Sequence, residues 1–253
     1  MNAIMPFVSI VVTAYLPKSK SYLDMCLRSI ENLDYPRDRF DVLIVSPDGF
    51  VSSSLYPVVH PKRTSYWNSH ALNVGADAAR KDAHYFLFLN DDVVLTASSL
   101  KNLVYASTLV NDRAVLMALS NDSQSKYVVG TPGGSGPYTL DQIRDPVALM
   151  GASSPYREPG IFFFETLCLY AFLCPSDLWR DVGGFDDEMR GGDDIDFSMR
   201  VRQKGYLNGI VLDSLIYHAG GVSASETLTP QMRSDDFVRF KAKWGFSPRW
   251  QNV

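Results

Sequence analysis

The amino-acid sequence predicts an α/β domain in which a mostly parallel central sheet is flanked by helices. Through the first half of the chain, short apolar runs alternate with longer stretches of helical periodicity. That order is typical of parallel strands joined by helical crossovers. Several apolar runs also end directly in polar or acidic residues, as strands do where they reach a ligand-binding edge.

The first expected strand is residues 7–13, because this run is rich in β-branched side chains. Apolar side chains then recur at helical spacing over residues 19–32, which predicts a helix. Residues 40–46 form a second apolar run, and Pro47-Asp48-Gly49 after it is a turn signature.

The alternation continues to residue 119. A short apolar run predicts a third strand at 55–59, and an alanine-rich stretch predicts a helix at 68–80. Residues 84–89 read HYFLFL, which predicts a buried strand. A helix is expected at 98–110 and a strand at 114–119.

The second half is less regular. Residues 130–137 form a glycine- and proline-rich loop, which we expect to act as a lid over a ligand. A strand is expected at 165–173 and a short helix at 175–182. Acidic residues at its start and a glycine past its end predict a helix at 193–203, and a late strand follows at 210–217. The tail has three aromatic residues at near-helical spacing: Phe237, Phe240 and Trp244.

The composition predicts a packed core and argues against a nucleic-acid partner. Of the 253 residues, 46% are hydrophobic and 21% are charged, whereas a disordered chain has fewer apolar residues and more charge. Lys plus Arg is 24 and Asp plus Glu is 28, so the net charge is −4. A general nucleic-acid binder usually carries a basic excess instead.

Cysteine usage and hydropathy predict a cytoplasmic protein. The three cysteines are widely spaced and form no C-x-x-C pair, so neither a zinc site nor a disulfide framework is indicated. The apolar start carries Pro6 and has no basic residue before it, unlike a signal peptide. Residues 161–175 are the most apolar later segment, but they are too few for a transmembrane span and Glu165 interrupts them.

Polar groups follow three of the expected strands: Thr13 after the first, Asp48 after the second and Asp91-Asp92 after the fourth. We expect them to converge on one crevice. Each could instead be a solvated turn residue, Asp48 above all. Two adjacent carboxylates after a buried strand repel each other unless a cation or donor lies nearby. Asp92 is therefore a candidate ligand for Mg²⁺ or Mn²⁺, which bind beside substrate phosphates.

A second acidic cluster lies later in the chain, at residues 186–188 and 193–196. The acidic residues at 193–196 could simply complement the dipole of a helix N-terminus. A carboxylate beside a bound substrate can also act as a general base. Three carboxylates within four positions favour a raised pKa for at least one of them.

His218 ends an expected strand, and a lone histidine in such a place is often structural. Imidazole is also a common metal ligand, and paired with Asp92 it would form a mixed histidine–carboxylate site suited to Mn²⁺. The other three histidines have no partner pattern and are expected to be structural: His60, His70 and His84.

Motifs for several other chemistries are absent from the sequence. It has no G-x-x-x-x-G-K-[ST] phosphate loop and no G-x-G-x-x-G after the first strand. It also lacks G-x-S-x-G and H-E-x-x-H. Recognition of phosphate through a metal remains possible without these motifs.

Taken in order, the motifs resemble those of the family 2 glycosyltransferases, inverting enzymes with the GT-A fold. The matching runs extend from residue 8 to residue 245 and are VSIVVTAY, IVSPDG, FLFLNDDVVL, VGGFDDEMRGGDDIDFSMRVRQKGY, YHAGGVS and FKAKWG. The resemblance implies a single GT-A domain over residues 1–253. Its parts would be a nucleotide-binding half (1–120), an acceptor and catalytic half (121–225) and a helical tail (226–253).

The resemblance also implies roles for single residues. The donor site would contain Thr13, Ala14, Tyr15, Asp48, Asn73, Asn90 and Asp91, with Thr13 and Asp48 at the nucleobase, Tyr15 against the base and Asp91 at the ribose or sugar. Asp92 and His218 would bind Mn²⁺ or Mg²⁺ at the donor diphosphate. Asp194 would be the catalytic base, with Asp193 beside it, and Trp179 would pack in the core.

Three positions depart from the family pattern. Asn90 stands where the acidic motif often begins with Asp, and Asp193 stands where Glu is commoner. Pro47 replaces the first carboxylate of the base-binding pair, which weakens any inference about the nucleobase. The donor is expected to be a UDP-sugar first, then a dTDP- or GDP-sugar, and the acceptor a hydroxyl of a glycan or another molecule.

Two other function classes stay open. A sugar nucleotidyltransferase also combines an α/β nucleotide site with a metal-binding carboxylate, but it should carry a glycine-rich basic loop where this chain has Leu16-Pro17-Lys18. A catalytically silent sugar-nucleotide binding module would need no base at Asp193-Asp194.

Overall fold

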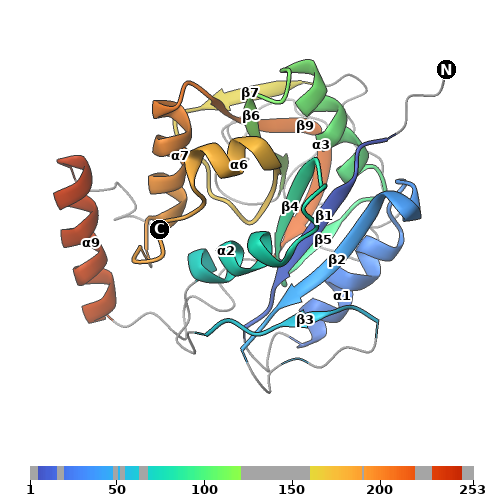
Figure 1. The fold of residues 1–253 in the computed structure, drawn as a ribbon, viewed down its shortest axis with the longest axis horizontal. Coiled ribbons are helices and arrows are strands. Elements are labelled where there is room, and N and C mark those ends of the chain that lie inside the picture. The colour runs from blue at the N-terminus through green and yellow to red at the C-terminus, as the bar shows by residue number, and fades with distance from the viewer. Residues whose placement is uncertain are drawn as a thin grey trace, which may run out of the picture.

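The computed structural model describes residues 5–15, 20–47, 51, 55–62, 68–120, 160–189, 191–219 and 230–246. Within them the chain forms one nine-stranded sheet with α-helices packed around it (Figure 1). The strands are β1 (Val8–Thr13), β2 (Phe40–Val45), β3 (Val58–Val59), β4 (Tyr85–Asn90), β5 (Val93–Leu95), β6 (Ala114–Leu119), β7 (Ile161–Phe164), β8 (Ala171–Pro175) and β9 (Leu207–His218). The α-helices are α1 (Lys20–Glu31), α2 (Asn68–Ala78), α3 (Ser99–Leu109), α6 (Ser176–Val182), α7 (Asp193–Gln203) and α9 (Pro230–Trp244).

The sheet has the strand order β3-β2-β1-β4-β8-β6-β9-β5, and β7 pairs with β9. The strands from β3 to β4 are parallel, which agrees with the expected α/β crossovers of the first half. β8 then enters between β4 and β6 and is antiparallel to both. β9 is parallel to β6 but antiparallel to β5 and β7. The whole sheet is therefore mixed, and its parallel part is the half that carries Thr13 and Asn90.

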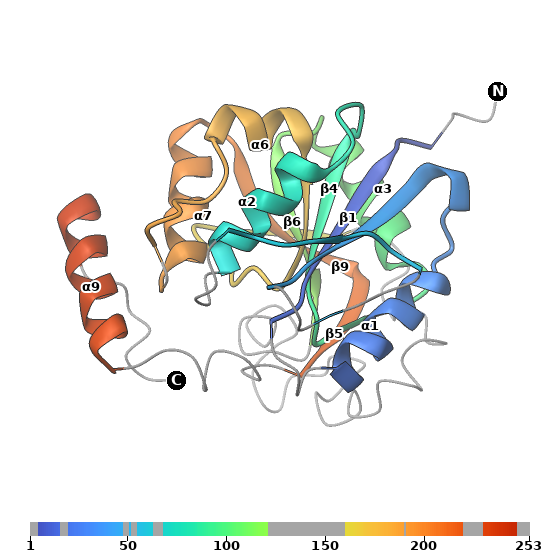
Figure 2. The same ribbon diagram turned by 60° about the horizontal axis from the view of Figure 1, so that its bottom comes forward.

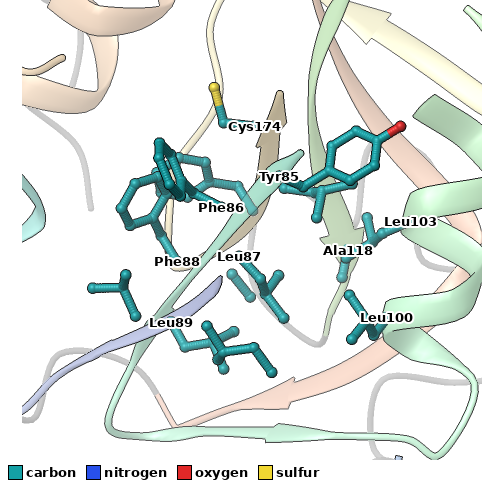
Figure 3. Packing of buried hydrophobic residues seen from close by; sticks show 14 of the residues in the cluster. Tyr85, Phe86, Leu87, Phe88, Leu89, Leu100, Leu103, Ala118 and Cys174 are labelled. Carbon is teal, nitrogen blue, oxygen red and sulfur yellow. The ribbon is translucent and has the colours of Figure 1, made fainter. Parts of the chain in front are cut away.

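Both faces of the sheet are covered, and for this reason the central strands are mostly apolar on both faces. Phe86 and Phe88 lie on one side of β4, and Leu87 lies on the other with Leu100 and Leu103 of α3 (Figure 3). Figure 2 shows α2 and α6 on one side of the sheet and α1 on the other. Alternation of side chains along β4 thus divides the core into two layers.

An aromatic cluster fills the layer under α6 and α7. The ring centroids of Phe88 and Trp179 lie 4.6 Å apart, and those of Phe185 and Phe197 lie 4.5 Å apart. Phe172 of β8 stacks on Phe88 at 4.9 Å. Trp179 therefore packs in the core, as expected. Contacts of this kind fix Phe185 and Phe197 on the sheet, and with them the chain on either side of the second acidic cluster.

Most of the predicted helices and strands are present, but the strand expected at residues 165–173 lies elsewhere in the chain. Residues 165–170 are irregular, the strand is β8 at Ala171–Pro175, and a separate strand, β7, precedes it. Leu167, Leu169 and Tyr170 are buried without being in a strand, so hydrophobicity alone could not locate the break. The short strand β5 after Asp91-Asp92 was not predicted either.

Two further expectations fall outside the described residues: the loop at 130–137 and Asp48. Among the helices described, none has the length and apolar character needed to cross a lipid bilayer.

Candidate functional site

The carboxyl ends of three strands meet at one edge of the sheet. Thr13, the last residue of β1, lies opposite Val45 of β2 and opposite Asn90 of β4. Such an edge is where ligands bind in open α/β sheets. The predicted convergence is therefore seen for Thr13 and for the residues that follow Leu89.

The end of β1 is tied to the start of α2. The Thr13 hydroxyl donates a hydrogen bond to Asn68 Oδ1 at 3.0 Å, and Asn68 is the first residue of α2. Ala14 is buried and donates its backbone N–H to Val45 O at 2.9 Å, while Tyr15 beyond it is half-buried. These three expected donor-site residues are thus consecutive in the chain, at the point where it leaves β1 and the core.

Asp91 and Asp92 form the turn between β4 and β5 and are almost fully buried, with exposed fractions of 4% and 5%. β5 returns along β9, with Val93 opposite His218. This pairing brings His218 Nε2 to 3.4 Å from Asp92 Oδ1. The structure therefore brings together the two residues predicted as metal ligands.

The plane of the His218 ring is held by a residue that the sequence analysis missed. The rings of Tyr170 and His218 are stacked, with centroids 4.2 Å apart and an angle of 18° between their planes. The Tyr170 hydroxyl lies 2.6 Å from the hydroxyl of Ser120. Tyr170 stands within an apolar run, where an aromatic residue indicates only core packing, so no sequence signal set it apart.

A carboxylate and an imidazole side by side are suitable ligands for Mn²⁺, and the carboxylate is suitable for Mg²⁺. Within the described part of the chain, no group of three or more histidine, cysteine or acidic side chains could hold an ion. Asp92 and His218 would thus be two of the several ligands that Mn²⁺ or Mg²⁺ takes.

The second acidic cluster begins in a tight turn after α6. Gly183 and Gly184 have positive φ angles of 85° and 67°, which disfavour any residue with a Cβ atom. A Cβ at Gly184 would also lie only 2.6 Å from Asn73 Oδ1. Position 184 therefore requires glycine for two reasons: its φ is positive, and α2 lies too close to leave room for a Cβ atom.

Side chains of α2 hold the acidic turn at residues 185–189. Asn73 Nδ2 donates to Phe185 O at 3.0 Å and to Asp187 Oδ1 at 2.6 Å, and the Phe185 N–H donates to Asn73 Oδ1 at 2.9 Å. The Ser69 hydroxyl donates to Met189 O at 2.9 Å. Asn73 was expected in the donor site, and in the structure its amide group binds this turn.

His70, which has no partner pattern in the sequence, joins the same network. Its Nδ1 lies 2.9 Å from Asp187 Oδ2, and the second ring nitrogen is buried. One carboxylate oxygen of Asp187 is thus hydrogen-bonded to Asn73 and the other to His70. More than a hundred residues separate these partners along the chain, so local spacing could not reveal the contact.

Asp193 and Asp194 are half-buried in the first turn of α7, which begins after Gly192 at a φ of 74°. Burial and the adjacent charge of Asp194 raise the pKa of Asp193 well above its ordinary value, and Asp236 of α9 adds to the shift. This agrees with the expectation that at least one carboxylate of the cluster has a raised pKa.

Asp196 has a different environment. It is fully buried, and its Oδ2 accepts a hydrogen bond from Arg200 Nε at 2.9 Å. Its Oδ1 accepts from Trp244 Nε1 at 2.9 Å. This carboxylate is therefore part of the packing between helices, whereas Asp193 and Asp194 are only half-buried.

Comparison with known proteins gives similarity at the level of structure. No protein-family model matches the chain, and no curated protein matches it. The crystal structure of S. aureus TarS 1–349 in complex with UDP-GlcNAc matches with a TM-score of 0.63 and 16% identity, over 93% of this chain and 65% of that chain. GalNAc-T7 with UDP, GalNAc and Mn²⁺ matches with a TM-score of 0.61 and 16% identity, over 86% of this chain and 44% of that chain.

These structural neighbours are glycosyltransferases of the GT-A fold. The chain therefore has the GT-A fold, which confirms the fold class that the motifs implied. It spans about 44–65% of the length of the structures named above, and at 16% identity the likeness extends to the fold alone.

Proposed function

We propose that the chain is an inverting glycosyltransferase that moves a sugar from a nucleotide-diphosphate donor to an acceptor hydroxyl. The observation that carries this proposal is the Asp92–His218 pair at the strand ends of a GT-A fold. Structures of the same fold hold UDP-GlcNAc in TarS and UDP with Mn²⁺ in GalNAc-T7. A UDP-sugar is therefore the first donor to test, followed by dTDP- and GDP-sugars.

The donor lies across the ends of β1 and β4 in this proposal. Thr13, Ala14 and Tyr15 line the nucleobase pocket, and Asp48 accepts a hydrogen bond from an N–H of the base. Asn90 and Asp91 contact the ribose or the sugar. Thr13 and Asn90 are suited to this because their strands are paired in register at the edge of the sheet.

Asp92 and His218 would hold Mn²⁺ or Mg²⁺ against the donor diphosphate. A metal bound there supplies neutralisation of the charge on the leaving diphosphate. His218 must be neutral to bind it, so its ligand capacity is lost when the imidazole is protonated. Tyr170 orients the ring by stacking, which keeps Nε2 directed at Asp92.

Asp194 is the proposed general base. An acceptor hydroxyl is a poor nucleophile at neutral pH, and Asp194 takes its proton as the oxygen attacks the anomeric carbon. The attack comes from the face opposite the diphosphate, so one displacement inverts the configuration. Asp193 lies beside the base and contacts acceptor or donor.

In this proposal Asn73 and His70 act at one remove from the chemistry. They hold Asp187 and Phe185 in the turn that leads to α7, and so they position the helix that carries the base. Asn73 is thus proposed as a positioning residue, since both ends of its amide contact the turn.

Thermal melting with nucleotides tests the donor site. The purified protein is melted with UDP, GDP, dTDP or CDP, each with and without Mn²⁺. A ligand that binds only the folded state adds about 2.7 kcal/mol of stability at a hundred times its Kd. We expect UDP to raise the Tm and most of the shift to need Mn²⁺.

The Asp92→Ala variant is the matched control for this experiment. It should lose the part of the shift that depends on Mn²⁺, because it removes one of the two proposed protein ligands. A wild-type protein whose Tm is unchanged by all four nucleotides would refute the donor site. A Mn²⁺-dependent shift that survives in Asp92→Ala would remove Asp92 from it.

A further inference from the structure

The C-terminal helix α9 lies beside α7 at one end of the molecule in both ribbon views (Figures 1 and 2). The sequence of this segment predicts only a helical tail with three aromatic residues. In the structure its basic side chains contact the second acidic cluster, which contains the proposed base Asp194.

Lys243 is the centre of this contact. Its Nζ lies 2.8 Å from Asp186 Oδ2 and 2.7 Å from Asp196 Oδ1, so one ammonium group joins the acidic turn to α7. Burial by itself raises the pKa of Asp186. The hydrogen bonds from Lys243 and the Glu188 N–H, together with the charges of Lys243 and Arg200, outweigh burial and hold the pKa below its ordinary value. Without Lys243, these two carboxylates would lose the cation between them.

Trp244 and Arg239 add two more connections. Trp244 Nε1 donates to Asp196 Oδ1 at 2.9 Å. Arg239 Nη1 donates to Glu188 O at 2.7 Å and lies 3.2 Å from Glu188 Oε2. The contacts of these side chains therefore end on residues 186–196, the segment that contains Asp193 and Asp194.

Asp196 also links α9 to the turn at Gly183 and Gly184, through Arg200. It is fully buried, and its other oxygen accepts from Arg200 Nε at 2.9 Å. Arg200 Nη1 donates in turn to Val182 O at 3.2 Å and Gly184 O at 2.6 Å. A continuous chain of hydrogen bonds thus runs from α9 through Asp196 and Arg200 to the turn that α2 holds from the other side.

The approach of α9 to the segment is close in a second place. Asp236 of α9 is buried, and its Oδ2 lies 3.3 Å from where a Cβ would stand at Gly191. Gly191 comes just before the helix start at Asp193. The backbone that leads into α7 is therefore packed against α9 as well as linked to it by charge.

We propose that α9 is a strap that positions the first turn of α7, with Lys243 and Trp244 as positioning residues that act through Asp196. The inference rests on the proposed function, because it assigns the strap to the helix that carries the general base. It predicts that loosening α9 misplaces Asp194 relative to the acceptor while the donor site at β1 and β4 stays intact.

Three variants test the strap in the full chain. Trp244→Phe removes the N–H donor and keeps an aromatic ring for Phe240, whose centroid lies 6.4 Å from that of Trp244. Lys243→Met removes the cation and keeps most of the aliphatic stem, and Lys243→Arg restores a cation. Lys241→Met, at an exposed position on the same helix, is the matched control.

The first measurement is hydrogen exchange over residues 185–200, which needs no substrate. Trp244→Phe and Lys243→Met should exchange about tenfold faster there than the wild-type protein, as expected for one lost hydrogen bond to a charged group. Lys243→Arg should stay close to wild type, and so should Lys241→Met. Unchanged exchange in both loosening variants would overturn the strap.

The second measurement is release of UDP from UDP-GlcNAc with Mn²⁺, a hydrolysis in which a water molecule takes the place of the acceptor hydroxyl and receives the sugar. The loosening variants should lose about tenfold to a hundredfold in kcat, because a small misplacement of a reacting group is costly, while the KM for UDP-GlcNAc stays the same. Lys243→Arg should recover most of the loss. A change confined to KM, or equal losses in the Lys241→Met control, would overturn the positioning role.

The two measurements separate failure of the inference from failure of the proposed function. If the wild-type protein releases no UDP from any sugar nucleotide, the proposed function fails. Faster exchange in the variants would then still support the strap as a structural link. If the wild-type protein is active and the variants keep its kcat, the strap fails and the glycosyltransferase proposal stands.

Discussion

Asp92 and His218 show what single residues in the sequence can and cannot predict. Each follows a predicted strand, so a shared edge was a reasonable expectation, and the structure places their side chains 3.4 Å apart. The ring of Tyr170, stacked on His218, was not predicted, because its position depends on how β8 and β9 lie relative to each other. Residue types at strand ends were therefore more informative than residues within apolar runs.

Asn73 and His70 illustrate the other limit. Both contact Asp187, which lies more than a hundred positions away in the sequence. Their spacing of three residues on one helix makes it possible for both to reach the same partner. It does not say which partner, so neither contact with Asp187 was predicted: the family resemblance implied a donor-site role for Asn73, and His70 was expected to be structural.

The raised pKa of Asp193 predicts how stability depends on pH. Burial and Asp194 disfavour the charged form, so the folded state keeps a proton that the unfolded chain has already lost. This contribution to stability is complete below the unfolded pKa of about 3.9 and is lost as pH rises through the folded value. Asp193→Asn should therefore become more stable than the wild-type protein as pH rises, measured as the free energy of unfolding in urea.

A control for this pH dependence is Asp177→Asn, in the first turn of α6. Its carboxylate is 97% exposed, so the same substitution there removes no buried charge. An Asp193→Asn variant whose stability relative to wild type does not change between pH 5 and pH 8 would contradict the assigned environment of Asp193.

At the scale of elements, the turn at residues 183–189 is the junction between the two sides of the site. The turn follows α6, and its Phe185 packs in the aromatic cluster. Asn73 of α2 is hydrogen-bonded to the same turn. The close approach of α2 is possible only because position 184 has no side chain.

Gly184→Ala tests this junction, and Gly183→Ala is its control. Both positions have positive φ, so each substitution should cost about 1–2 kcal/mol of stability through backbone strain. A Cβ at Gly183 has no atom within 4 Å, whereas at Gly184 it would meet Asn73 Oδ1 at 2.6 Å. Gly184→Ala should therefore be clearly less stable than Gly183→Ala in urea unfolding, and equal stability would contradict the close approach.

Local patterns predicted most elements but missed those that depend on distant pairing. β6 and α7 have the predicted bounds, because one is a short apolar run between turns and the other has an acidic start and a glycine past its end. β5 has only three residues and exists because β9 pairs with it. The apolar stretch from 161 to 175 contains two strands with a partly buried irregular segment between them, which periodicity does not distinguish.

At the scale of the whole molecule, the sheet unites the two halves that the sequence suggested. The parallel strands β1, β2 and β4 carry Thr13, Asn90 and the Asp91-Asp92 turn, and β8 and β9 extend the same sheet into the second half. The order of strands could not be predicted, because β8 enters between β4 and β6 by antiparallel pairing across long stretches of chain. The GT-A fold was implied by the order of the motifs, and comparison with TarS and GalNAc-T7 agrees with it.

In the proposed function the two halves have separate tasks: the strand ends bind the donor, and the start of α7 activates the acceptor. A base acts in the transition state, so its loss should lower the rate without weakening donor binding. The most direct test is Asp194→Asn, measured by UDP release from UDP-GlcNAc with Mn²⁺ and by the Kd for UDP. We predict a loss of about 10²–10⁴ in rate with an unchanged Kd. A variant that retains the wild-type rate, or that loses rate and UDP binding equally, would contradict it.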